Sequence, residues 1–140
     1  MDCIFCKIIS GELPSCKIYE DSNFLAILDI MPVNYGHTLI IPKAHFKHIL
    51  DMPDIYTEKI YQIIKKLSLA IKASLQCDGL NIIQNVEKAG GQEVFHSHLH
   101  IIPRYLNDSI KLTLPKKKYE NNDAMQQLAE KISQHISKVA

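Results

Sequence analysis

Three histidines stand at alternate positions late in the chain, at His96, His98 and His100. Alternate side chains of a β-strand point to the same face of a sheet, so a strand here would carry all three imidazoles on one side. Leu99 and Ile101 would then face the opposite side. A neutral imidazole, with an unperturbed pKa of about 6.5, can bind metal ions, transfer protons or attack an electrophile near pH 7. This spacing predicts a functional site.

The alternative reading of these histidines is structural. A single histidine is usually a surface residue or a satisfied core residue, and a histidine-rich tract can be a metal-binding tag. This tract lies inside the chain, among strand-forming residues, and Ile101-Ile102-Pro103-Arg104 closes it. We therefore favour the functional interpretation.

A second motif, Cys3-Ile4-Phe5-Cys6, has the Cys-x-x-Cys spacing of a redox pair or of half a zinc site. A thioredoxin-like redox pair follows a strand and begins a helix, and here no predicted strand precedes the motif. A zinc site needs two further ligands from elsewhere in the chain. Cys16 and Cys77 lack such spacing, and we expect both to be buried apolar residues.

The elements that position these residues follow from hydrophobic periodicity and turn residues. Apolar residues recur at helical spacing from Ile60 to Leu75, which predicts one long helix from Pro53 to about Gln76. The other predicted elements are a helical turn at 7–11, strands at 17–20, 24–29, 37–41 and 80–85, a fifth strand carrying the histidines, a short helix at 44–50 and a C-terminal helix at 123–139.

Composition narrows the class of protein. A chain of 140 residues with 46% hydrophobic and 22% charged residues is typical of one globular domain. The net charge of +1 gives no general attraction to nucleic acid or to an acidic membrane. The run Lys116-Lys117-Lys118 has no interleaved aromatic residues, so we interpret it as a solvated loop. The apolar runs are too short to span a bilayer, and we see no signal peptide. Four cysteines in such a chain favour the reducing cytoplasm.

The residues His96-Ser97-His98-Leu99-His100-Ile101-Ile102 resemble the signature of the histidine triad (HIT) family. The segments Gly91–Val94, Pro103-Arg104 and Gly36–Lys43, together with the Cys-x-x-Cys, are similar to the bacterial, Hint-like members. The resemblance covers roughly residues 3–105. It implies an α+β fold with an antiparallel sheet of about five strands that continues across a homodimer. The whole chain, 1–140, would be one HIT domain, with a helical C-terminal extension over about 106–140.

The resemblance also implies an activity, which is hydrolysis at the α-phosphate of a purine nucleotide. His98 would attack phosphorus to form a nucleotidyl-histidine, which water then hydrolyses. Asn85, His100 and the backbone N–H groups near Gln92–Val94 would stabilise the charged transition state. His37 would support the triad. The implied catalytic residues are His37, His96, His98 and His100.

The implied nucleotide pocket combines a polar and an apolar part. The carboxylate of Asp29 would bind the ribose hydroxyls, and Phe5, Leu28 and Ile30 would line the base pocket. The full set of implied nucleotide-binding residues is Phe5, Leu28, Asp29, Ile30, Asn85, Gln92, Glu93, Val94, His98 and His100.

In some relatives a structural zinc is held by the Cys-x-x-Cys, an upstream histidine and the first triad histidine, which here are Cys3, Cys6, His45 and His96. Such a closed site does not activate water. On the residues alone, the weaker alternative is that His45 is an ordinary helix-surface residue and that Cys3 and Cys6 are buried apolar residues. We expect no organic cofactor.

The chain departs from the family pattern at three positions. Ser97 stands where relatives prefer an apolar residue, and Glu87 stands where they often have a glycine. Glu93 stands where some relatives have a serine.

Several functions compete for this chain. We expect hydrolysis of nucleoside phosphoramidates. The alternatives are a dinucleoside polyphosphate hydrolase, a nucleotide-binding module with little turnover, and a hydratase with catalytic zinc on the three histidines.

Overall fold

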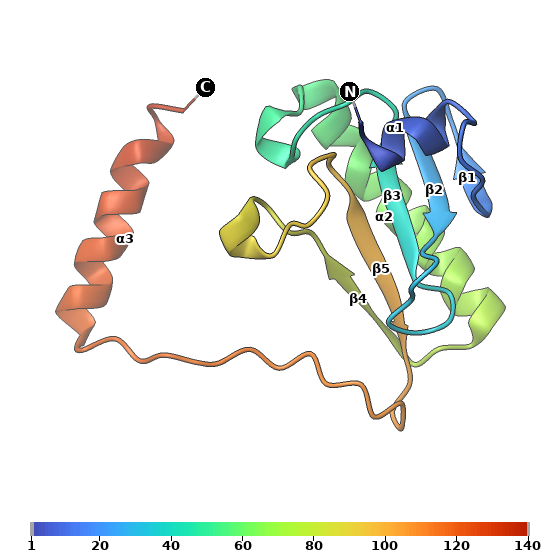
Figure 1. The fold of residues 1–140 in the computed structure, drawn as a ribbon. Coiled ribbons are helices and arrows are strands. Elements are labelled where there is room, and N and C mark those ends of the chain that lie inside the picture. Colours follow the sequence, from blue (N-terminus) through green and yellow to red (C-terminus); the bar gives the residue numbers. More distant parts are fainter. Residues whose placement is uncertain (1, 140) are drawn as a thin grey trace. The chain divides into compact units, whose positions relative to one another are not determined.

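The computed structural model describes residues 2–139, and the chain divides into two compact units, 1–109 and 110–140. The first unit contains an antiparallel sheet of five strands in the order β1-β2-β3-β5-β4 (Figure 1). The strands are β1 (Lys17–Glu20), β2 (Phe24–Leu28), β3 (Thr38–Pro42), β4 (Gly79–Ile83) and β5 (Leu99–Arg104). The prediction of an α+β fold with a five-stranded antiparallel sheet is confirmed.

The long helix α2 (Asp54–Leu75) covers one face of this sheet. Its buried residues recur every three or four positions, and they pack against alternate residues of the strands, including Ala26 and Ile40. Each such Ile or Leu side chain contributes about 1.5–3 kcal/mol when fully buried. The helix follows Pro53 and ends at Gln76, whose backbone is left-handed with φ 52°. The sequence prediction for this helix is confirmed.

The short helix α1 (Ile4–Ile9) lies on the opposite face of the sheet (Figure 1). Buried Phe5 packs there with Leu25, Leu39 and Ile41, whose positions alternate with those that face α2. The helix begins three residues before the predicted turn at 7–11, because the Cys3 side chain caps it by accepting the backbone N–H of Cys6 at 3.5 Å. The capping residue is therefore also the first residue of the Cys-x-x-Cys motif.

The prediction of a helix over residues 44–50 is wrong. Residues 44–48 form a loop, and one turn of 3₁₀ helix, η1 (Ile49–Asp51), follows it. Its carbonyl groups bind distant parts of the chain: Phe46 O accepts the N–H of Ser97 at 2.7 Å, and Lys47 O accepts the side-chain amide of Gln92 at 2.7 Å. A helix would have used these carbonyls for its own hydrogen bonds.

The prediction that one strand carries all three histidines is also wrong. Strand β5 begins at Leu99, paired with Ile40, so that His100 lies in the strand while His96 and His98 precede it. The 96–98 segment pairs instead with the 44–50 loop, through the N–H of Ser97. The histidines can therefore face different sites.

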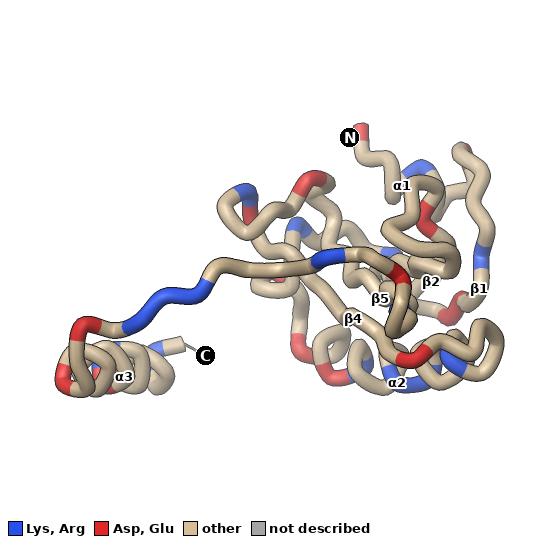
Figure 2. Tube along the Cα trace, turned by 90° about the horizontal axis from the view of Figure 1, so that it is seen from below, with Lys and Arg blue, Asp and Glu red and all other residues tan. Residues whose placement is uncertain are grey.

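The second unit contains the helix α3 (Asn122–Ile136), close to the predicted 123–139. Asn121 caps it by accepting the N–H of Ala124 at 2.8 Å, which is a common way to begin a helix. The basic run 116–118 lies in the exposed, irregular segment that leads into α3, as the solvated-loop interpretation predicts (Figure 2). Across residues 2–139, no helix is both long and apolar enough to cross a membrane.

Candidate active site and metal-binding cluster

His98 is held in one tautomer by a backbone hydrogen bond. Its Nδ1 lies 2.7 Å from the carbonyl oxygen of His96, and a carbonyl only accepts, so Nδ1 carries the hydrogen. The lone pair is then on Nε2. Burial lowers the pKa of His98, while the bond to His96 and the charges of Asp29 and Glu93 oppose this shift. The result is a neutral imidazole with a free Nε2, which is the form required for a nucleophile.

His100 is oriented by His37. The backbone N–H of Val33 donates to Nδ1 of His37 at 3.0 Å, so His37 carries its hydrogen on Nε2. That hydrogen is donated to Nδ1 of His100 at 2.8 Å, which leaves His100 with a hydrogen on its own Nε2. Burial, with His98 and His37 adding to it, lowers the pKa of His100 to about 4. His100 is therefore a neutral hydrogen-bond donor at pH 7.

The rings around His98 restrict its position. Phe5 packs against it with ring centroids 5.0 Å apart, and His100 lies on another side with centroids 5.1 Å apart. Ser97, between His96 and His98, is buried and finds the polar partner that a hydroxyl needs there, because it accepts the side-chain amide of Gln84 at 3.2 Å. The departure from the family pattern at this position is thus accommodated.

A pocket of about 610 Å³ opens beside His98 and His100, a volume that suits a nucleotide-sized ligand. Seven of the implied nucleotide-binding residues line it: Asp29, Ile30, Asn85, Glu93, Val94, His98 and His100. Phe5 is outside the described lining of this pocket, and its ring packs against His98. Leu28, at the end of β2, is outside the set of described residues that line it. We call this the nucleotide pocket below.

Gln92 belongs to the loop that precedes the histidines, and its side chain is buried. It is not among the described residues that line the nucleotide pocket. Its side-chain amide donates to Lys47 O at 2.7 Å and to Val94 O at 3.0 Å, and its Oε1 accepts the N–H of Glu87 at 2.8 Å. Its backbone N–H already donates to Glu87 O at 3.0 Å. In this arrangement Gln92 shapes the loop, and its N–H is not available to a phosphate, contrary to the sequence expectation.

Three further residues line the nucleotide pocket that the sequence did not single out, namely Ile4, Met31 and Leu39. Leu39 is the Cα partner of His100 in the β3–β5 pairing, so a correct strand register would have identified it. Ile4 and Met31 come from α1 and from the segment after β2. Their approach to the pocket depends on tertiary packing, for which the sequence carries no local signal.

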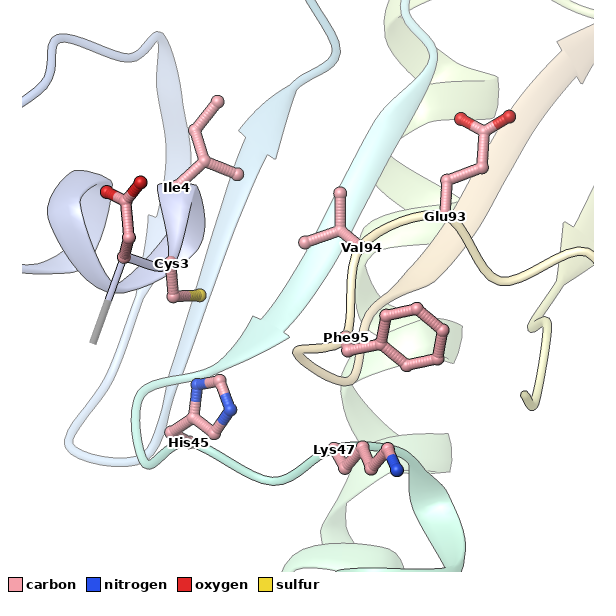
Figure 3. Close-up of a pocket in the computed structure, with 8 residues that line it drawn as sticks. Cys3, Ile4, His45, Lys47, Glu93, Val94 and Phe95 are labelled. Atoms are coloured by element: carbon pink, nitrogen blue, oxygen red, sulfur yellow. The ribbon is translucent and has the colours of Figure 1, made fainter. Parts of the chain in front are cut away.

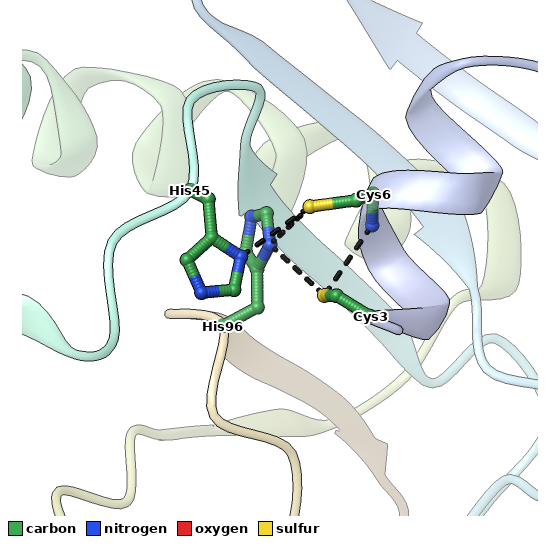
Figure 4. A group of neighbouring side chains, drawn as sticks. All are labelled: Cys3, Cys6, His45 and His96. Atoms are coloured by element: carbon green, nitrogen blue, oxygen red, sulfur yellow. Dashed lines mark hydrogen bonds between the residues drawn. The ribbon is translucent and has the colours of Figure 1, made fainter. Parts of the chain in front are cut away.

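Cys3, Cys6, His45 and His96 form a second cluster, in which one ligand atom of each lies within 4.8 Å of the others (Figure 4). Cys6 Sγ lies 3.3 Å from Nδ1 of His45, and Nδ1 of His96 lies 3.4 Å from Cys3 Sγ and 3.5 Å from Cys6 Sγ. Two ligand atoms on a tetrahedral zinc lie about 3.5 Å apart, given Zn–S of about 2.3 Å and Zn–N of about 2.0–2.1 Å.

The chemistry of these donors also fits a metal ion. Nε2 of His96 donates to the carbonyl oxygen of Pro42 at 2.8 Å, so its Nδ1 lone pair faces the two cysteines, as in a metal-ligating histidine whose other nitrogen is held by a backbone carbonyl. Burial and the neighbouring Cys3 raise the pKa of the Cys6 thiol. A bound cation would supply the positive charge that two adjacent thiolates need.

Comparison with known proteins agrees with the fold. The HIT domain family model matches residues 10–107. An uncharacterized HIT-like protein of Borreliella burgdorferi is 44% identical over 137 residues, covering 96% of this chain and 99% of the relative. Adenylylsulfatase HINT3 of Arabidopsis thaliana is 42% identical over 109 residues, covering 78% of this chain and 55% of that protein.

Among solved structures, a zinc-bound histidine triad family protein of Mycobacterium smegmatis superposes with a TM-score of 0.76 at 37% identity, covering 99% of this chain and 98% of that one. The family match spans more than half of the chain, and it includes the three histidines and His37. This chain belongs to the HIT family.

Proposed function

We propose that this protein hydrolyses purine nucleoside phosphoramidates or related nucleotidyl compounds through a nucleotidyl intermediate on His98. The observation that carries the proposal is the 2.7 Å hydrogen bond from His98 Nδ1 to the His96 carbonyl, because it leaves Nε2 as a nucleophile in the wall of the nucleotide pocket.

The reaction needs two displacements at phosphorus. In the first, Nε2 of His98 forms a bond to the α-phosphorus, and the bond to the leaving nitrogen breaks. The nitrogen keeps the electron pair, takes a proton from solvent and departs as a neutral amine. In the second, water attacks phosphorus and gives a proton back to solvent, while the bond to Nε2 breaks with the electron pair returning to His98, so that the nucleoside monophosphate is released. The Nε2–H of His100 stabilises the negative oxygens in both transition states, because it is a neutral donor held in place by His37.

The rest of the nucleotide pocket suits a nucleoside. Asp29 accepts the N–H of Met31 through Oδ1 at 2.9 Å, and its carboxylate has further acceptor capacity for two ribose hydroxyls. The apolar side chains of Ile4, Ile30 and Leu39 line the same pocket and suit a purine ring. We assign the base to this apolar part and the α-phosphate to the end that His98 and His100 form.

The named relative in Arabidopsis supports attack at an α-phosphate, since its name describes release of sulfate from an adenylyl group. It leaves the leaving group in this protein open, and a dinucleoside polyphosphate hydrolase remains the second candidate. A catalytic zinc on the three histidines is disfavoured, because His96 turns to the cysteine cluster and Nδ1 of His98 is bound to a carbonyl.

We propose zinc as the resident metal of Cys3, Cys6, His45 and His96, as the zinc-bound relative suggests. With four protein ligands the ion would have a structural role. It would tie α1 to the segment that precedes β5, and so hold Phe5 against His98. Two reduced cysteines in this cluster favour the cytoplasm as the compartment.

We further propose that the protein is a homodimer that extends the sheet. Strand β4 lies at the edge of the sheet and carries Ile82, which is 48% exposed. An apolar edge strand is a ready surface for pairing with a second copy. Size-exclusion chromatography with light scattering tests this, and a monomeric mass at micromolar concentration would contradict it.

The central experiment is mass spectrometry after a brief, quenched incubation with adenosine 5′-phosphoramidate, with AMP release measured in parallel. We expect an adenylyl adduct on His98 and steady AMP release. His98→Asn should lose both, while His135→Asn, at an exposed histidine of α3, should retain both. Absence of adduct and release in the unsubstituted protein would favour the binding module. Normal turnover by His98→Asn would contradict the nucleophile assignment.

A further inference from the structure

Glu93 stands where three pockets meet. It lines the nucleotide pocket, together with Gly91 and Val94. It also lines a second pocket of about 600 Å³, formed by Asp2, Cys3, Ile4, His45, Lys47, Glu93, Val94 and Phe95 (Figure 3), and a third of about 480 Å³, formed by Lys88, Gly91, Gln92, Glu93 and Phe95. The Glu93 carboxylate is therefore common to the nucleotide pocket and both neighbouring spaces.

The leaving group of the substrate must extend out of the nucleotide pocket, because the nucleoside occupies its apolar part and His98 approaches the phosphorus from one side. The second pocket shares Ile4, Glu93 and Val94 with the nucleotide pocket, and the third shares Gly91 and Glu93. Whichever of the two spaces the leaving group enters, Glu93 is the charged residue at the boundary that it crosses.

The lysines of the two outer pockets lie beyond this boundary. Lys47 lines the second pocket, with its ammonium 5.7 Å from the centroid of the Phe95 ring, and Lys88 lines the third. Neither is among the described residues that line the nucleotide pocket. On the wall shared with the nucleotide pocket, no lysine opposes the negative charge of Glu93, so a charged group a few bonds from the reacting nitrogen meets Glu93 first. Only a longer leaving group would also meet Lys47 or Lys88.

We propose that Glu93 determines leaving-group specificity, by favouring amines that carry a positive charge near phosphorus and disfavouring anionic leaving groups such as sulfate or a second nucleotide. The inference rests on the proposed function and narrows its substrate class. Nitrogen takes a proton from solvent as the P–N bond breaks, so it carries positive charge in the transition state, beside the Glu93 carboxylate. It then keeps the electron pair of the bond and leaves as a neutral amine. A leaving group that departs as an anion is repelled at the same position.

Three adenosine phosphoramidates with the same reacting bond test this, made from 1,3-diaminopropane, propylamine and 3-aminopropanoate. At the end of a three-carbon chain, close to the reacting nitrogen, they carry a cationic, a neutral and an anionic group. We expect kcat/KM to fall in that order, by about fivefold a step at low salt, which is the size of one Coulomb contact near a protein surface. The differences should shrink at high salt, because the charges are then screened.

Glu93→Gln should bring the three substrates to within about twofold of one another. Glu58→Gln, which removes the same charge from an exposed position of α2, should leave the order unchanged. Equal preference in the unsubstituted protein, or an unchanged order in Glu93→Gln, would overturn the inference. Failure of the proposed function gives a different result, because none of the three substrates would then form an adduct on His98.

Discussion

His37 donates its Nε2 hydrogen to Nδ1 of His100 across 2.8 Å, and the N–H of Val33 fixes the direction of that bond. His100 can accept only while its Nδ1 is unprotonated. A proton added there would place two N–H groups against each other, in a place where burial already disfavours charge. The pair therefore keeps His100 neutral, and it links the stability of the fold to the pH.

The first prediction concerns that pH dependence. The pKa of His100 is about 4 in the folded protein, and about 6.5 in an unfolded chain. Between these values the unfolded state binds a proton that the folded state does not, so stability is full above pH 6.5 and falls as the pH drops toward 4. The loss should reach roughly 3 kcal/mol at most.

Urea unfolding of the metal-free protein at several pH values between 4.5 and 7.5 measures this loss. His100→Asn removes the titrating group, so the difference in unfolding free energy between the two proteins should shrink as the pH falls. A difference that stays constant over this range would show that His100 does not carry the linkage.

The second prediction concerns the metal cluster. Cys6→Ser should abolish binding of one zinc per chain and lower the melting temperature by roughly 10 °C, because a tightly bound ligand stabilises the folded state by about 3–4 kcal/mol. Cys16→Ser is the matched control, since Cys16 is exposed and outside the cluster. Elemental analysis and thermal melts in the same buffer report both quantities. Zinc retained in full by Cys6→Ser would argue against this ligand set.

The exposure of Cys16 and the burial of Cys77 illustrate what the sequence could predict. Periodicity located the five strands and the long helix, because alternation and helical spacing are local signals. It could not tell which of two similar apolar cysteines is buried, and the expectation for Cys16 was wrong. Burial of a single residue depends on what packs against it, here α2 and β5 for Cys77 and solvent for Cys16.

The site, too, combines features that local sequence signals predict with features that depend on distant contacts. The spacing of the histidines predicted the kind of chemistry that we propose, but not the separation of His96 from His98. That separation depends on two carbonyls of distant residues, Pro42 O for His96 and Phe46 O for Ser97. Cys-x-x-Cys predicted half of a metal site, and its partners 39 and 90 residues away from Cys6 came only from the family resemblance. Contacts of this range have no signature in a single sequence.

The third prediction concerns Glu87, which has φ 64° and ψ 168°. This region of backbone space is almost restricted to glycine and costs other residues about 1–3 kcal/mol. Glu87→Gly should therefore stabilise the protein by about 1 kcal/mol, after the greater flexibility of glycine in the unfolded chain is allowed for. Equilibrium unfolding in urea measures the change.

Glu87→Ala provides the control, because alanine keeps the strained backbone and loses the side chain that lies 3.5 Å from Nε2 of His48. It should be no more stable than the unsubstituted protein. If glycine and alanine destabilise equally, the contact with His48 outweighs the strain, and Glu87 is retained for that contact.

The last prediction concerns Gln92, which is 4% exposed and connects three parts of the site. Its side chain binds Lys47 O, Val94 O and the N–H of Glu87. Gln92→Ala removes all three hydrogen bonds and leaves their partners without them, which costs about 2–4 kcal/mol. Because Val94 and Gly91 line the nucleotide pocket on either side of Gln92, the loop they belong to should also lose its order.

Activity and stability should then fall together. We expect kcat/KM for adenosine 5′-phosphoramidate to drop by at least tenfold in Gln92→Ala, with KM rising, because the variant keeps His98 and His100 but not the wall beside them. Gln127→Ala, at an exposed position of α3, should change neither quantity. A variant with the expected loss of stability but unchanged kinetics would show that the loop does not contact the substrate, and the nucleotide pocket would have to be redrawn without Val94 and Glu93.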